Sequence, residues 1–139
     1  MVEREVVLAK LSIIDRCLGR IADVQANRGA TLALVDVEDI TVLNLTRAAQ
    51  ATMDLATHVV TTEGYGLPDS VASAFTMLAT HRVISQPLAE RMRKMVGFRN
   101  IAVHDYQTLD PQIVQAIILH HLEDIRAFAR KVVERFEVV

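Results

Sequence analysis

Hydrophobic residues recur along this chain at the three- and four-residue spacing that places them on one face of an α-helix. The first such segment runs from Val2 to about Asn27, where asparagine and the nearby Gly29 suit a helix end. The second runs from Asp36, predicted as its N-cap, to about Thr62, and it is apolar around most of its circumference. These patterns predict two long helices, the second of them central in the fold.

Three more helical segments follow a loop at 61–68 that is marked by two glycines and a proline. Each opens with a proline suited to the first turn of a helix. The third helix is expected from about 68 to 84, the fourth from about 87 into the segment 99–106, with its end near Asp105 and Tyr106, and the last from 110 onward through Phe136. No segment alternates as a strand does. The sequence therefore predicts an all-α fold, with residues 1–139 forming one antiparallel, up-and-down bundle of four long helices plus an additional helix.

The composition narrows the class of protein. Hydrophobic residues make up 51 % of the chain, aromatic residues 4 % and charged residues 23 %, which is typical of a soluble domain with an aliphatic core. The net charge of −2 argues against a general nucleic-acid binder, so any contact with RNA must rest on a local patch. The single cysteine, Cys17, is expected in the core. Neither a signal peptide nor a membrane-spanning segment is evident, and a cytoplasmic location is expected.

A polar stripe interrupts the second helix at Asn44, Arg47, Asp54 and His58. Asp54 and His58 are four residues apart and can touch. The stripe is consistent with a solvated face carrying one ion pair or with a polar wall beside a site. A metal pair is a third interpretation, but two ligands are too few and no others are evident nearby.

The candidate chemistry lies in the segment 99–106, Arg-Asn-Ile-Ala-Val-His-Asp-Tyr. Arg99 is a permanent planar cation suited to phosphate, and His104 can exchange a proton near neutral pH. Together they suit the cleavage of a phosphodiester, with the RNA 2′-hydroxyl as nucleophile. The same residues could instead be a structural histidine and a surface arginine at a helix end.

The one dense basic patch, Arg91, Arg93 and Lys94, precedes this motif by one or two helical turns. It is either a solvated helix face or a surface that holds a polyanion backbone, so these residues are candidates for RNA contact. The adjacent His120 and His121 point to different faces and are expected at the surface or in an interface.

An arginine and a histidine separated by four residues, with a polar residue after the arginine and a tyrosine two after the histidine, resemble the HEPN superfamily. Within it, the chain is similar to the HepT-like toxins of bacterial and archaeal toxin–antitoxin pairs. The size, the all-helical order, the late position of the motif and the helix carrying Asp54 and His58 agree with this resemblance.

The resemblance implies a toxin of a type II/VII-like pair that is a metal-independent endoribonuclease without cofactor. Arg99 and His104 would be its catalytic pair, Asn100 would help to position the phosphate, and the active site would lie in a homodimer cleft. The partner would be a nucleotidyltransferase-fold antitoxin of the MntA type, which can silence the toxin by AMP transfer to Tyr106. The alternative is a non-catalytic helical module that binds a nucleotide or serves as the partner of a nucleotidyltransferase.

Overall fold

The computed structural model describes residues 1–28 and 30–138, and within them six α-helices and no strand are found. The helices are α1 (Arg4–Ala26), α2 (Leu34–Thr62), α3 (Val71–Thr80), α4 (Gln86–His104), α5 (Pro111–His120) and α6 (Leu122–Phe136), with a short 3-10 turn η1 (Tyr106–Thr108) after α4. The all-α prediction is confirmed. No helix of the described part is long and apolar enough to cross a membrane.

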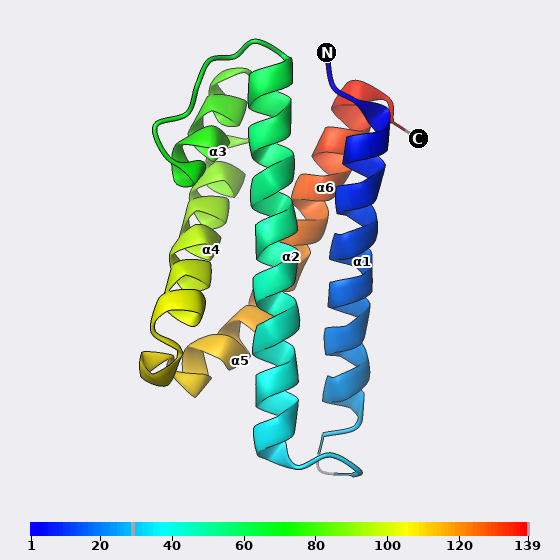
Figure 1. Cartoon of the computed structure of the whole chain (residues 1–139), viewed down its shortest axis with the longest axis vertical. Helices are drawn as coiled ribbons and strands as arrows, with labels where there is room; N and C mark the ends of the chain where they lie inside the picture. The colour runs from blue at the N-terminus through cyan, green and yellow to red at the C-terminus, as the bar shows by residue number, and fades with distance from the viewer. Residues whose placement is uncertain (29, 139) are drawn as a thin grey trace.

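The long helix α2 occupies the centre of the bundle, as its nearly continuous apolar surface predicts (Figure 1). Helix α1 lies antiparallel along one side of α2, and α3 and α4 pack on the other side. Helix α6 lies behind them and contacts both α2 and α4, whereas α5 crosses the lower end of the bundle. This arrangement brings the end of α4 close to the beginning of α2.

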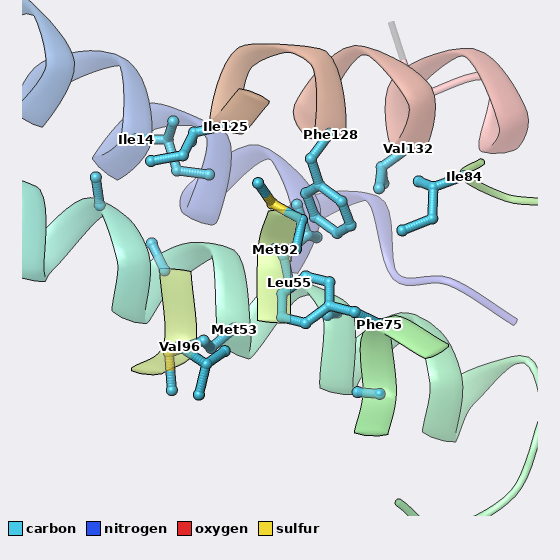
Figure 2. Packing of buried hydrophobic residues seen from close by; sticks show 14 of the residues in the cluster. Ile14, Met53, Leu55, Phe75, Ile84, Met92, Val96, Ile125, Phe128 and Val132 are labelled. Atoms are coloured by element: carbon cyan, nitrogen blue, oxygen red, sulfur yellow. The ribbon is translucent and has the colours of Figure 1, made fainter. Parts of the chain in front are cut away.

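The core is aliphatic, with one aromatic pair at its centre. Phe75 of α3 and Phe128 of α6 meet edge to face with ring centroids 5.3 Å apart, and both are fully buried. Figure 2 shows Leu55 and Met92 packed beside this pair. The rings therefore join α3 to α6. Helix α4, which carries the motif, enters the same core through Leu88, Met92, Val96 and Phe98.

Two helix starts differ from the predictions. Helix α2 begins at Leu34 with Ala33 in the N-cap position, and Asp36 lies exposed in its first turn. A carboxylate there is favoured by the helix dipole without capping the backbone. Helix α3 begins at Val71, after Pro68, because Ser70 and Ser73 form a reciprocal capping box.

The predicted end of α3 near Ile84 is also wrong. The helix ends at Thr80, and Arg82 adopts a left-handed conformation with φ of 60°. The Val83 amide then donates to the Leu78 carbonyl and the Arg82 amide to the Ala79 carbonyl, which is the Schellman motif. Glycine usually occupies this left-handed position, so the arginine does not indicate a helix end in the sequence. At the end of α1, Asn27 is the C-cap as predicted, whereas Gly29 lies outside the described residues.

The last predicted helix is in fact two. Helix α5 ends at His120, and His121 separates it from α6, which starts at Leu122. The His121 ring lies 3.0 Å from the Asp124 carboxylate, which also accepts from Arg91 of α4. These contacts fix α6 on α4, while α5 turns away across the end of the bundle (Figure 1). Both histidines are exposed, as expected.

Candidate active site

Helix α4 carries the motif to the end of the bundle. Ser85 caps the start of α4 by accepting a hydrogen bond from the Leu88 amide, and Pro87 occupies the first turn. Buried Met92 and Val96 fix the helix against the core. The last turns of α4 then present Arg99 and His104, and the helix ends at His104 itself.

Arg99 is half-buried, and its Nε atom is enclosed without a hydrogen-bond partner among the described residues. Its Nη1 atom donates to the side-chain oxygen of Asn100 at 3.2 Å. A buried N–H group without an acceptor costs free energy, and an incoming anionic oxygen removes that cost. The guanidinium is therefore held by its neighbour while one donor stays available, which is an arrangement suited to a phosphate.

His104 is exposed in the last turn of α4, where its imidazole is open to a substrate. The chain leaves the helix at Asp105, whose φ of −150° and ψ of 56° are no longer helical, and it enters η1 at Tyr106. Arg99, Asn100 and His104 thus share the end of one helix. That helix is anchored by core packing, which gives the site a rigid base.

Tyr106 is held by the second helix. Its hydroxyl donates a hydrogen bond of 2.5 Å to the carboxylate of Asp39 in α2. This bond raises the pKa of Tyr106 to about 12, with smaller contributions from burial and from the negative charges of Asp39 and Glu38. The residue nevertheless remains 42 % exposed. The phenol is therefore held in place yet accessible to solvent.

Asp39 is the site residue that sequence reasoning missed, because it lies 67 positions from its partner. The one signal available was topological, since antiparallel neighbours bring the end of one helix beside the beginning of another.

Two residues of the polar stripe of α2, Asp54 and His58, contact α1 and the chain start. The Asp54 carboxylate lies 3.2 Å from the Lys10 ammonium and accepts from Gln50 at 2.8 Å. The His58 Nε2 atom accepts from the Glu3 amide at 3.1 Å. Asp54 and His58 are therefore engaged with other partners, and Asp54 lies about 22 Å along α2 from Asp39 at a rise of 1.5 Å per residue.

One protomer does not bring Asp54 or His58 to the motif, so their predicted supporting role stays a prediction. Residues 1–28 and 30–138 contain no group of three or more potential metal ligands. In that part of the chain Asp54 and His58 thus have no further ligands with which to hold a metal ion.

Two members of the basic patch already have partners within the chain. The Arg91 guanidinium pairs with Asp124 at 2.9 Å, and Arg93 donates to the Thr76 hydroxyl at 3.0 Å. Lys94 is exposed on the rim of a largely apolar pocket of about 390 Å³ between α4, α5 and α6. Their contact with RNA stays a prediction.

Known proteins match this chain over nearly its whole length. The family described as Ribonuclease HepT-like matches residues 14–132. An mRNA nuclease HepT from Shewanella oneidensis is 40 % identical over 89 % of this chain and 93 % of its own. A tRNA nuclease HepT from Aphanizomenon flos-aquae is 24 % identical over 94 % and 90 %.

Solved structures agree with the sequence relatives. The tri-AMPylated Shewanella oneidensis HEPN toxin, in complex with an MNT antitoxin, superposes with a TM-score of 0.84 at 38 % identity, covering 91 % of this chain and 96 % of that one. A toxin–antitoxin structure with AMP-PNP gives 0.82 at 38 % identity, covering 91 % and 97 %. The resemblance read from the motif is confirmed, and the chain belongs to the HepT-like ribonuclease family.

Proposed function

We propose that this protein is the toxin of a toxin–antitoxin pair and cleaves RNA without a metal ion, using Arg99 and His104. The observation that carries the site assignment is the enclosed Arg99 Nε atom, which lacks an acceptor within the described chain. A phosphate oxygen supplies that acceptor. The exposed imidazole of His104 ends the same helix and completes the pair.

RNA brings its own nucleophile, so the protein has to supply only proton transfer and charge stabilisation. His104 removes the proton of the 2′-hydroxyl, the 2′-oxygen bonds to the adjacent phosphorus, and the bond to the 5′-oxygen breaks. The products are a 2′,3′-cyclic phosphate and a 5′-oxygen, which takes up a proton to become a hydroxyl. Arg99 stabilises the charge that builds on the phosphate oxygens, an effect often worth a few kcal/mol. Asn100 fixes the orientation of the guanidinium.

A homodimer supplies the second proton-transfer group, since two copies of His104 in one cleft can act as base and acid. Large apolar side chains next to the motif support self-association: Ile101 is 48 % exposed, Val103 is 46 % exposed, and Val35 at the start of α2 is 64 % exposed. Exposed apolar groups gathered around a polar site are typical of an interface. Light scattering that showed only monomer at micromolar concentration would contradict the shared cleft.

The partner in this proposal is a nucleotidyltransferase antitoxin of the MntA type, which transfers AMP to Tyr106. The relative crystallised with an MNT antitoxin is tri-AMPylated, which supports the chemistry. The Tyr106 oxygen attacks the α-phosphorus of ATP, pyrophosphate leaves, and Asp39 is placed to accept the phenolic proton. AMP next to Arg99 adds bulk and negative charge, so it excludes the RNA phosphate.

The test is cleavage of a defined RNA in the presence of EDTA, with identification of the product ends. The wild-type protein, its Tyr106 verified as unmodified by intact mass, is compared with His104→Ala and Arg99→Ala. His120→Ala is the matched control, because this exposed histidine lies outside the motif. Cyclic phosphate ends from wild type and control, and none from the two motif variants, are expected. An inactive wild type would favour a non-catalytic partner module, and full activity of His104→Ala would refute the catalytic assignment.

A further inference from the structure

A groove of about 620 Å³ runs between α1 and α2, on a surface that the proposed mechanism does not use. Its charged lining consists of four cations, Lys10, Arg16, Arg20 and Arg47, and one carboxylate, Asp54. Asp54 is neutralised by Lys10 at 3.2 Å. Three arginine charges therefore remain in one groove of a chain whose net charge is −2.

These three arginines are exposed, and none of them takes part in the ion pairs found among the described residues. They differ in this respect from Arg91 and Arg93, whose guanidinium groups already have partners. A guanidinium without a carboxylate partner is free to bind phosphate oxygens in a bidentate manner. The groove therefore offers more unpaired guanidinium groups to a polyanion than the basic patch of α4 does.

The groove follows the helices toward the proposed site. Arg16 and Arg20 are one turn apart on α1, about 6 Å along its axis, and Arg47 faces them from α2. The α2 wall continues to Leu43, which lies one helical turn after Asp39. Asp39 in turn holds Tyr106. The groove therefore lies about one turn of α2 from the residue that holds Tyr106, and Tyr106 follows His104 by two positions.

We propose that this groove binds the sugar–phosphate backbone of single-stranded RNA flanking the cleaved bond, with Arg16, Arg20 and Arg47 contacting successive phosphates. The inference rests on the proposed ribonuclease function and adds a substrate-binding surface to it. Backbone contacts of this kind give affinity and register without base selection. Ile13 and Ile40 on the walls offer apolar surface to the sugars and unstacked bases.

Binding is tested with a fluorescent single-stranded RNA whose 2′-O-methyl groups remove the nucleophile, so that cleavage cannot interfere. The variant Arg16→Gln/Arg20→Gln/Arg47→Gln is compared with Arg126→Gln/Arg130→Gln/Lys131→Gln, which removes three charges from exposed positions of α6. Each phosphate contact contributes about 0.7 to the slope of log K against log salt for a single strand. The slope is expected to fall by about 2 in the groove variant and to stay unchanged in the control. Equal slopes in the groove variant and the wild type would overturn the proposal.

Cleavage assays with a short and a long substrate distinguish RNA binding in the groove from catalysis at Arg99 and His104. A dinucleotide is too short to reach the groove, so the groove variant should cleave it as the wild type does, while KM for a long RNA rises and kcat is retained. If the wild type cleaves both substrates and the groove variant matches it on both, the groove proposal fails and the ribonuclease stands. If the wild type cleaves neither, the proposed function fails. Light scattering that shows a dimeric wild type and a monomeric groove variant would assign the groove to the subunit interface and overturn RNA binding there.

Discussion

Removing the carboxylate of Asp39 should lower the pKa of Tyr106 from about 12 toward the ordinary tyrosine value of about 10. The hydrogen bond to Asp39 is the largest cause of the increase, and the negative charge of Asp39 adds to it. Asp39→Ala removes both contributions. It should therefore shift the balance between phenol and phenolate by up to about a hundredfold. Asp39→Asn keeps a neutral acceptor and should give an intermediate value.

The assay is an ultraviolet titration of tyrosine ionisation. The chain contains only one other tyrosine, Tyr65, so Tyr65→Phe in every protein isolates the signal of Tyr106. Phenylalanine retains the ring that stacks on His81 with centroids 3.8 Å apart, and the local fold should persist. Glu38→Gln is a useful control, because the Glu38 charge is the smallest contribution and its loss should lower the pKa of Tyr106 least.

The hydrogen bond between Tyr106 and Asp39 also makes the stability of the fold depend on pH. The folded protein holds the Tyr106 proton more tightly than the unfolded chain does, since its pKa is raised. The Asp39 bond therefore stabilises the fold below about pH 10, and this contribution is lost as the pH rises through about 12. A Tyr106 pKa that stayed near 12 in both Asp39 variants would refute the assignment of the shift to this carboxylate.

Two further predictions concern the scaffold that carries the site. Phe128→Ala removes a fully buried ring that meets Phe75 at 5.3 Å, and it should lower the free energy of unfolding by about 3–5 kcal/mol in urea denaturation; a loss below 1 kcal/mol would mean that the pair is not the centre of the core. Asp110→Ala removes the side chain that caps α5 by accepting from the Gln112 amide at 2.9 Å, and it should cost about 1 kcal/mol. Asp110→Asn keeps an acceptor there and should retain most of that stability, so equal losses in the two variants would contradict the capping role.

The helices could be predicted because their signals are local. Apolar spacing, the prolines of α4 and α5 and the Asp110 cap all act within a few residues, and each of these features is present in the structure. The two misplaced helix boundaries, the end of α3 and the break between α5 and α6, lie at residue types that seldom end a helix. Arg82 occupies a left-handed position that glycine usually fills, and His121 breaks a continuous apolar pattern. Neither residue type marks a helix end reliably, so the sequence alone could not place these two boundaries.

The site residues likewise fall into two groups, those that are close in the sequence and those that only helix packing brings together. Arg99, Asn100 and His104 lie within six positions of one helix, so the spacing alone was enough to group them. Asp39 reaches Tyr106 only through the packing of α4 against α2. The groove likewise needs α1 and α2 to lie side by side before Arg16 and Arg20 can face Arg47. A single sequence does not record these long-range contacts, because no local pattern depends on them.

The position of Tyr106 connects the two cationic regions of the proposed enzyme. Through Asp39 the phenol is fixed to α2, one helical turn before the groove residue Leu43. By the chain it lies two residues after His104, at the end of α4. An AMP group at this oxygen would add a phosphate and a nucleoside at the end of α4, beside the beginning of α2. It would then compete with the RNA both at the cleaved phosphate and along the flanking backbone, so one modification could silence the enzyme without any change of fold.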